Sequence, residues 1–274
     1  MNGKYFTSFD GAKIYYHKSL KDKNKWLIFL HGLGGDLTAW KKERSYFSKL
    51  GISTIAMDLR GHGFSERRND QNFYKFENFA KDVEVLIEEE GIKGFILIGH
   101  CIGGIISIYF QAQSHYPSKG LILIDTTYKP VFFGKNFIPN VLLDKMIRLL
   151  LKVAPAKKAN GHEKHDQFVG TKDINLRRLL SDILHTSLRS YLMIFDSLVN
   201  FKAGDLLKKI QVPTLVIEGL EDSIFPPQLA IELSSRIKNS ELEFVKDADH
   251  ILVINNPKDL EKDIEKFLKR INFI

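Results

Sequence analysis

The single cysteine of the chain lies in a short glycine-flanked sequence that could hold a nucleophile. Residues 99–104 read G-H-C-I-G-G and directly follow the apolar run Phe95–Ile98. A nucleophile on a sharp strand-to-helix turn needs very small neighbours on each side, and Gly99 and Gly103 meet that need. The start of a following helix would favour a thiolate at Cys101. A small, unreactive buried cysteine would fit the same residues. Whether Cys101 is a nucleophile or a structural residue therefore depends on the other residues that could act with it.

A cysteine nucleophile of this kind needs a histidine base, and the chain has nine histidines. His250 lies in F-V-K-D-A-D-H-I-L, just after the last apolar run of the chain. His100 is adjacent to Cys101, and neighbouring residues on such a turn point away from each other. His162 and His165 belong to H-E-K-H, which lacks the i,i+4 spacing of a helical zinc motif, so no metal is expected. His250 is therefore the expected base.

The acid that orients this histidine is expected to be Asp222. It follows the apolar part of P-T-L-V-I-E-G-L-E-D, beyond the carboxyl end of a predicted strand, where the site loops of parallel sheets gather. Glu221 is a neighbour that could partly replace it, whereas Glu218 is expected to be structural. Asp125, in L-I-L-I-D-T-T, also follows an apolar run and is the second choice.

Backbone N–H groups are expected to stabilise an oxyanion beside the nucleophile. Ile102, directly after Cys101, supplies one of them, and Leu33 in the turn H-G-L-G-G at residues 31–35 supplies the other. Gly32 and Gly34 allow this turn to approach a ligand closely. The turn fits neither G-x-x-x-x-G-K-[ST] nor G-x-G-x-x-G, so nucleotide binding is not indicated and no cofactor is expected.

Four segments together resemble the α/β-hydrolase superfamily over nearly the whole chain. They are H-G-L-G-G at 31–35, D-L-R-G-H-G-F-S at 58–65, G-H-C-I-G-G at 99–104, and G-L-E-D at 219–222 with the pair Asp249 and His250. The chain order of cysteine, aspartate and histidine is also that of this superfamily. The resemblance implies an eight-stranded, mostly parallel sheet, a cap after the sixth strand, and a triad of Cys101, His250 and Asp222. It also implies that residues 60–65 help to form the entrance of the site.

Cysteine stands where most members of this superfamily have serine. Dienelactone hydrolases and polyhydroxyalkanoate synthases are similar in having cysteine there, but the synthases are far longer, and the other motifs are more like those of cap-containing esterases and lipases. A native cysteine and an introduced replacement of serine would give the same sequence. The resemblance implies hydrolysis of carboxylic esters, lactones or thioesters through an acyl-thioenzyme. The alternatives are an acyltransferase that uses the same intermediate and a non-catalytic, ligand-binding homologue.

Short apolar runs that alternate with amphipathic stretches predict the sheet that positions these residues. The predicted strands are Trp26–Leu30, Ile52–Met57, Phe95–Ile98, Leu121–Ile124, Thr214–Ile217 and Leu242–Val245. Continuous apolarity is typical of parallel strands buried on both faces. The predicted helices between and after them are Trp40–Leu50, Asn78–Glu90, Ile102–Tyr116, Gln228–Ile237 and Lys258–Ile271. This alternation indicates a doubly wound α/β fold, preceded by a hairpin at Asp10-Gly11.

The alternation stops between about Thr127 and Ile210. Val141–Val153 and Leu176–Phe201 have helical spacing, and the block is too long for a standard crossover. We therefore predict a helical cap at residues 127–210 on a core of residues 1–126 and 211–274, with two ordinary crossover helices as the alternative. Aromatic residues suggest an apolar acyl pocket, although most are expected to pack the cap onto the sheet: Phe132, Phe133, Phe137, Phe195 and Phe201.

Composition argues against several other classes of protein. The single cysteine forbids an internal disulfide, and no apolar run is long enough for a signal peptide or a membrane span, so a cytoplasmic location is expected. The formal charge is +7, but basic and acidic residues are interleaved, as at 258–263, so nucleic-acid binding is not expected. The expected partner is a small, apolar acyl substrate, and the oligomeric state is left open.

Overall fold

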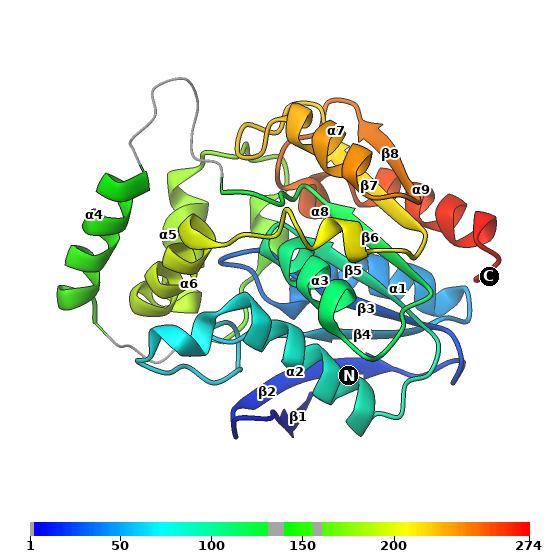
Figure 1. The fold of residues 1–274 in the computed structure, drawn as a ribbon, viewed down its shortest axis with the longest axis horizontal. Helices are drawn as coiled ribbons and strands as arrows, with labels where there is room; N and C mark the ends of the chain where they lie inside the picture. Colours follow the sequence, from blue (N-terminus) through cyan, green and yellow to red (C-terminus); the bar gives the residue numbers. More distant parts are fainter. Residues whose placement is uncertain (1–2, 131–139, 156–160) are drawn as a thin grey trace.

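An eight-stranded sheet forms the centre of the computed structural model, which describes residues 3–130, 140–155 and 161–274 (Figure 1). Its strand order is β1-β2-β4-β3-β5-β6-β7-β8. Strand β2 pairs antiparallel with β1 and β4, and all other neighbours pair parallel. The predicted mostly parallel sheet is confirmed. The strands are β1 (Lys4–Thr7), β2 (Lys13–Ser19), β3 (Trp26–Leu30), β4 (Ser53–Met57), β5 (Phe95–His100), β6 (Gly120–Ile124), β7 (Thr214–Gly219) and β8 (Ser240–Val245).

Burial explains why short apolar runs predicted these strands. Every residue of β3, β4, β6 and β7 is buried, as expected for strands covered on both faces. The edge strands β1 and β8 are only partly buried. Between β1 and β2 the chain turns at Asp10-Gly11, where Gly11 has φ of 83°, a conformation that glycine adopts without strain. The predicted hairpin is therefore present.

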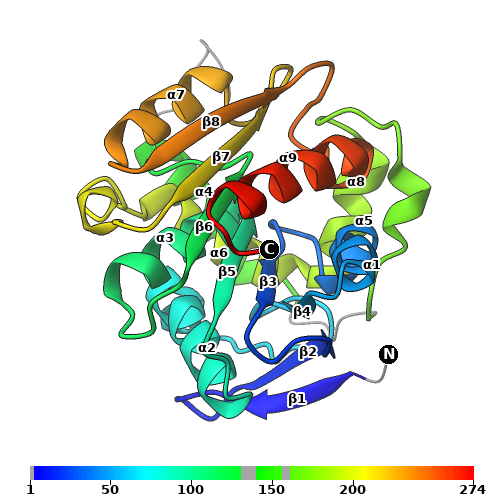
Figure 2. The ribbon, with the colours of Figure 1, turned by 90° about the vertical axis from the view of Figure 1, so that its right-hand side faces the viewer.

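Helices cover both faces of the sheet and form two apolar cores with it (Figure 2). On one face lie α2 (Phe76–Glu89), α3 (Ile102–Gln113) and α7 (Pro227–Arg236). On the other lie η1 (Leu37–Trp40), α1 (Lys41–Lys49), α8 (Leu252–Asn255) and α9 (Pro257–Arg270). The short helices η2 (Gln71–Tyr74) and η4 (Leu207–Lys209) complete the connections.

Three longer helices between β6 and β7 gather at one end of the sheet (Figure 1). They are α4 (Asn140–Val153), α5 (Leu176–Thr186) and α6 (Leu188–Asn200), with the short helix η3 (His165–Phe168) before α5. The prediction of one continuous helix over Leu176–Phe201 is wrong. Ser187 has φ of 75°, which ends α5, and its hydroxyl accepts the N–H of Ser190 and so caps α6.

A buried ion-pair group ties the loop after β4 to the sheet and to α2. The guanidinium of Arg60 is fully buried and lies 2.6 Å from the carboxylates of both Asp82 and Asp10. The side chain of Asp82 is likewise fully buried. These contacts make residues 58–65 a structural loop.

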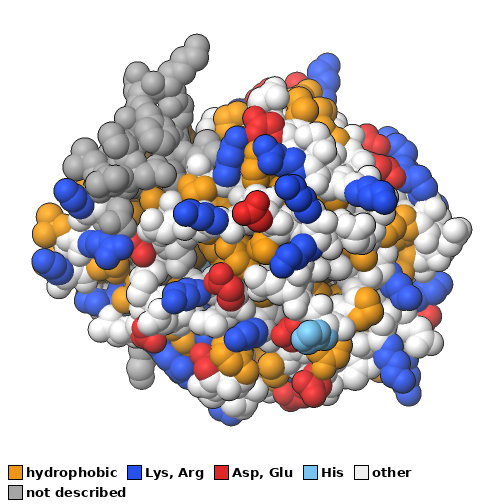
Figure 3. Space-filling view, in the orientation of Figure 1, with side chains coloured by type: hydrophobic (Ala, Val, Ile, Leu, Met, Phe, Trp, Pro, Cys, Tyr) orange, Lys and Arg blue, Asp and Glu red, His pale blue; other side chains and the backbone are white. Residues whose placement is uncertain are grey.

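Surface charge is mixed on the face seen in Figure 3, where Lys and Arg side chains are scattered among acidic and apolar ones. This arrangement agrees with the interleaved charges of the sequence. Within the described ranges, none of the helices is both long and apolar enough to cross a membrane.

Candidate active site

Cys101 occupies a strained turn between β5 and α3. Its φ is 52° and its ψ is −118°, a combination that L-residues rarely adopt. The turn is possible only because its glycines allow close backbone approach. A Cβ on Gly99 would lie 2.2 Å from the carbonyl oxygen of Gly103, and one on Gly103 would lie 2.3 Å from that of Leu30. The turn therefore has the form that the glycine spacing predicted for a nucleophile.

His250 and Asp222 meet beside this turn. Asp222 follows β7 and His250 follows β8, and the Oδ2 atom of Asp222 lies 2.7 Å from Nδ1 of His250. The other carboxylate oxygen of Asp222 accepts the N–H groups of Ile224 and Phe225, each at 2.7 Å. Burial opposes the ionisation of Asp222, but the charge of His250 and these hydrogen bonds lower its pKa. Asp222 is therefore a fixed, ionised partner of the imidazole.

The imidazole of His250 faces both Asp222 and Cys101. Burial disfavours its protonation, but the charges of Asp222 and Cys101, with the hydrogen bond to Asp222, raise the pKa of His250 well above its usual value. The arrangement favours an imidazolium beside the Asp222 carboxylate. His100 contacts the backbone of His250: its Nε2 donates to the carbonyl oxygen of His250 at 2.8 Å. Burial and the charge of His250 lower the pKa of His100 to about 3, so it stays neutral.

The other acidic candidates do not reach the imidazole. Asp125 accepts the N–H of Gly219 at 2.9 Å, and its nearest ring is that of His100, at 3.8 Å. Burial raises the pKa of Asp125 well above its usual value, so its carboxyl is neutral. Glu221 is half exposed and pairs with Lys172. Glu218 is buried, and burial raises its pKa to about 11. Among these carboxyls, the geometry selects Asp222.

The turn at residues 31–35 lies directly against the nucleophile. A Cβ on Gly32 would lie 3.1 Å from Cβ of Cys101, and Leu33 lines the same cavity as Cys101. Gly34 has φ of 82° and packs against Asp182, where a Cβ would lie 2.6 Å from Cβ of Asp182. Ile102 begins α3, and the first N–H groups of a helix have no partner within the helix. Leu33 and Ile102 thus both lie near Cys101, and their role as oxyanion donors stays a prediction.

A cavity of about 230 Å³ contains Cys101 and His250. Most of its wall is apolar and comes from the loops of the sheet and from α5 and α6: Leu33, Ile174, Leu176, Leu179, Phe195, Leu198, Ile224 and Phe225. Phe195 thus lines the cavity, whereas Phe201 packs against Phe76 with ring centroids 5.7 Å apart. Phe132, Phe133 and Phe137 lie outside the described residues. None of residues 58–65 lines this cavity, and the expectation that residues 60–65 help to form its entrance stays a prediction.

Asp173 is a further residue at the site that sequence reasoning missed. Its Oδ1 accepts the N–H of His250 at 2.7 Å, and its Oδ2 accepts both the N–H and the hydroxyl of Ser223. It therefore fixes the loop of the base relative to the loop of the acid. Asp173 lies in T-K-D-I-N, which has no recognisable motif, so local sequence carried no signal for this role.

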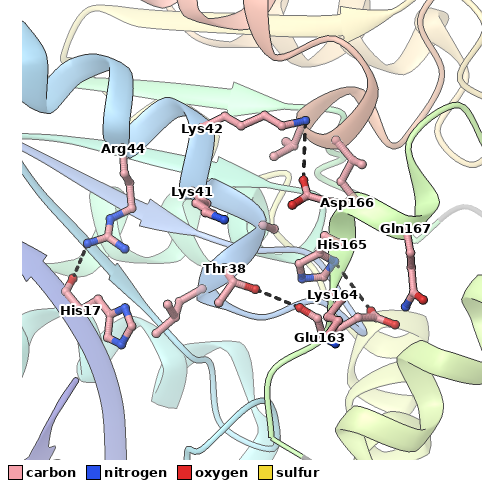
Figure 4. Close-up of a pocket in the computed structure, with 14 residues that line it drawn as sticks. His17, Thr38, Lys41, Lys42, Arg44, Glu163, Lys164, His165, Asp166 and Gln167 are labelled. Atoms are coloured by element: carbon pink, nitrogen blue, oxygen red, sulfur yellow. Dashed lines mark hydrogen bonds and ion pairs between the residues drawn. The ribbon is translucent and has the colours of Figure 1, made fainter. Parts of the chain in front are cut away.

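A second hollow, of about 550 Å³, lies between α1 and residues 163–167 (Figure 4). Lys42, Arg44 and Lys164 are among its lining residues, and no member of the Cys101–His250–Asp222 group lines it. The view shows His165 next to Glu163, with the hydroxyl of Thr38 donating to the carbonyl oxygen of Glu163 at 3.3 Å. Cys101 and His250 line the smaller, apolar cavity instead.

Two groups of described residues have a spacing that could hold a cation. The first contains Asp36, Asp58 and His162, and the second contains Asp125, Glu218 and Asp222. In the first group, Asp58 already accepts the ring N–H of His162 at 2.8 Å, besides backbone N–H groups. In the second, Asp222 is the partner of His250. Protein donors therefore already occupy Asp58 in the first group and Asp222 in the second.

Comparisons with known proteins agree with this geometry. Residues 25–257 match the family model described as alpha/beta hydrolase fold. The bifunctional esterase/perhydrolase DCH of Acinetobacter calcoaceticus is 25% identical over 282 residues, covering 97% of this chain and 99% of that protein. Human protein ABHD8 is 24% identical over 251 residues, which is 88% of this chain but only 54% of ABHD8, so the chain spans about half of that relative. The structure of an esterase from Exiguobacterium antarcticum superposes with a TM-score of 0.77 at 20% identity, covering 98% of this chain and 100% of that one.

Proposed function

Because this chain belongs to the alpha/beta hydrolase fold family, we propose that it hydrolyses carboxylic esters, lactones or thioesters with Cys101 as nucleophile. One observation carries the proposal: the sulfur of the strained turn shares a cavity with His250, whose Nδ1 lies 2.7 Å from Asp222. A nucleophile, a base and a group that orients the base form the minimum set for covalent acyl transfer. Esterase relatives support the substrate class.

In the acylation step, the thiolate of Cys101 attacks the carbonyl carbon, and the carbonyl electron pair moves to oxygen. The N–H groups of Leu33 and Ile102 donate to this oxyanion. When the tetrahedral intermediate collapses, the bond to the leaving oxygen breaks, and that oxygen takes a proton from the His250 imidazolium. The products are an alcohol and an acyl-thioenzyme. The raised pKa of His250 suits this step, because the imidazole must carry the proton beforehand.

In the deacylation step, neutral His250 takes a proton from water as the water oxygen attacks the thioester carbon. Collapse of the second intermediate releases the carboxylic acid and returns the thiolate of Cys101. Asp222 stabilises the imidazolium in both steps. Sulfur also restricts the substrates: a thiolate leaves a tetrahedral intermediate more readily than an amine does, so attack on an amide would revert. Esters and thioesters are therefore the expected substrates.

Residues 127–210 would act as a cap in this scheme. Helices α5 and α6 supply Leu176, Leu179 and Phe195 to the wall of the cavity, opposite the loops of the sheet. Burial of an apolar acyl chain against them would contribute about 25 cal/mol per Å² of apolar surface removed from water. This wall supports a small, apolar acyl substrate.

Mass spectrometry after brief exposure to a 4-nitrophenyl ester tests the proposal. We expect a mass increase equal to the acyl group, located on the peptide that contains Cys101, together with release of nitrophenol. Cys101→Ala should show neither the adduct nor enzymatic turnover. His250→Ala should slow adduct formation while leaving Cys101 accessible to a denatured-state thiol titration. A wild-type protein that retains its free thiol but forms no adduct with any of a series of activated esters would refute the proposal.

A further inference from the structure

The apolar cavity around Cys101 also has polar side chains in its wall that the proposed chemistry does not use, and Arg178 and Tyr191 are two of them. Arg178 on α5 and Tyr191 on α6 line it together with Cys101 and Leu33. Long polar side chains in an apolar cavity generally fix the orientation of a ligand. Their unused hydrogen-bond donors indicate what kind of ligand group they would recognise.

The guanidinium of Arg178 is only partly engaged by the protein. Its Nη2 donates to the carbonyl oxygen of Asp173 at 2.5 Å, and its Nη1 lies 3.7 Å from the carboxyl of Asp182. Its Nε is buried and has no hydrogen-bond partner among the described residues. A guanidinium carries five N–H donors, so most of those on Arg178 remain unused. The side chain is nevertheless mostly enclosed, with 17% of its surface exposed.

Carboxyl groups near Arg178 do not neutralise it. Burial and the charge of Glu163 raise the pKa of Asp182 to about 8, so at neutral pH this carboxyl is mostly protonated. The carboxylate of Asp173 accepts hydrogen bonds from Ser223 and from the N–H of His250. Arg178 therefore brings a guanidinium to the cavity, and its nearest carboxyl oxygen, that of Asp182 at 3.7 Å, lies beyond hydrogen-bond distance.

Tyr191 adds a neutral donor at the same place. Its hydroxyl has no hydrogen-bond partner within the described part of the chain, and burial raises the pKa of Tyr191, so it keeps its proton. A cation and a hydroxyl donor that line one cavity are complementary to an oxyanion with two acceptor oxygens.

We propose that Arg178 and Tyr191 form a subsite for a carboxylate at the far end of the acyl chain, so that the preferred substrates are monoesters of dicarboxylic acids. This inference rests on the proposed function for the ester bond, and it adds an anionic group to the apolar acyl chain expected from the sequence. The planar guanidinium can hold a carboxylate through two parallel hydrogen bonds. The apolar side chains of Leu179 and Phe195 would contact the methylene groups in between.

Ligand binding tests the subsite without requiring turnover. In the Cys101→Ala variant, the affinity for monomethyl adipate is compared with that for dimethyl adipate by isothermal titration calorimetry at pH 7. The two ligands have the same acyl chain and differ by one methyl group and one negative charge. A hydrogen bond to a charged group is worth about 1.5–3 kcal/mol, so the monoester should bind about tenfold to one-hundredfold more tightly.

Substitutions on α5 and α6 assign this preference to the two residues. Arg178→Gln in the Cys101→Ala background should reduce the preference to nearly one, Arg178→Lys should retain part of it, and Tyr191→Phe should lower it severalfold. Arg177→Gln is the matched control, because Arg177 is an exposed arginine on the same helix and does not line the cavity. If Arg178→Gln does not fold, the ratio of the affinities for monoester and diester is measured in Arg178→Lys and Tyr191→Phe instead.

The outcomes separate the subsite from the ester chemistry. Equal affinity for the two ligands, or a preference that survives Arg178→Gln, would overturn the subsite even if the wild-type protein hydrolyses esters. A clear preference for the monoester in a protein whose Cys101 never becomes acylated would leave the subsite intact and refute the proposed function. In the wild-type protein, kcat/KM for 4-nitrophenyl esters of adipic and hexanoic acids should show the same preference, again dependent on Arg178.

Discussion

Replacing Asp222 by asparagine removes the charge that the structure places against His250 while preserving the shape of the side chain. The contact to Nδ1 is 2.7 Å, and the side chain of Asp222 is completely buried. Its Oδ1 accepts two backbone N–H groups, and the Oδ1 of asparagine can accept the same two. The variant should therefore fold, and its effect should come from the imidazole.

The size of this effect follows from Coulomb's law. With charge centres about 4–5 Å apart and an effective dielectric constant of about 20, the ion pair is worth about 3–4 kcal/mol. Without the anion, the imidazolium is less stable, so the pKa of His250 falls. The same energy is lost in each transition state that contains an imidazolium, which lowers kcat/KM by about 10²–10³-fold.

The assay is the pH profile of kcat/KM with an alkyl ester, whose leaving oxygen needs the proton of His250. We expect the alkaline limb of the profile to move to lower pH in Asp222→Asn. Asp125→Asn is the matched control, because Asp125 is already neutral and contacts Gly219 instead of the imidazole of His250. A wild-type profile for Asp222→Asn, or a shifted profile for Asp125→Asn alone, would refute the assignment of the acid.

Three further substitutions test the support of the site through urea or thermal unfolding. Gly103→Ala should lower the free energy of unfolding by about 3 kcal/mol, because the new Cβ would lie 2.3 Å from the carbonyl oxygen of Leu30; an unchanged urea midpoint would contradict this. Arg60→Ala should lower the free energy of unfolding by about 3–5 kcal/mol, because it leaves the buried carboxyl of Asp82 without its partner. The double variant Arg60→Ala, Asp82→Ala should recover part of that loss. Burial raises the pKa of Glu218 to about 11, so its contribution to stability is complete below the unfolded pKa and is lost as the pH rises towards the folded one. Glu218→Gln should therefore raise the melting temperature more at pH 9 than at pH 5, and an equal change at both values would show that Glu218 is ionised in the folded protein.

Local patterns were enough to predict most of the fold. Each predicted strand and helix of the sheet layers is present, because a run of apolar residues has the same meaning wherever the rest of the chain lies. The strained turn at Cys101 was also predictable, since Gly99 and Gly103 are neighbours of Cys101 in sequence. The error at Leu176–Phe201 has a local cause as well: apolar spacing is continuous through Ser187, and only its positive φ divides the helix.

Contacts between distant segments depended on the tertiary structure. Sequence order could rank Asp222 above Asp125, but both follow buried strands, and only the arrangement of the loops after β7 and β8 brings one of them to His250. Asp173, Arg178 and Tyr191 carried no motif, because their roles arise where helices α5 and α6 meet the sheet. The strained turn that holds Cys101 is thus encoded within a few residues, whereas the contact of Asp222 with His250, the hydrogen bonds of Asp173 and the polar part of the cavity wall follow from long-range packing.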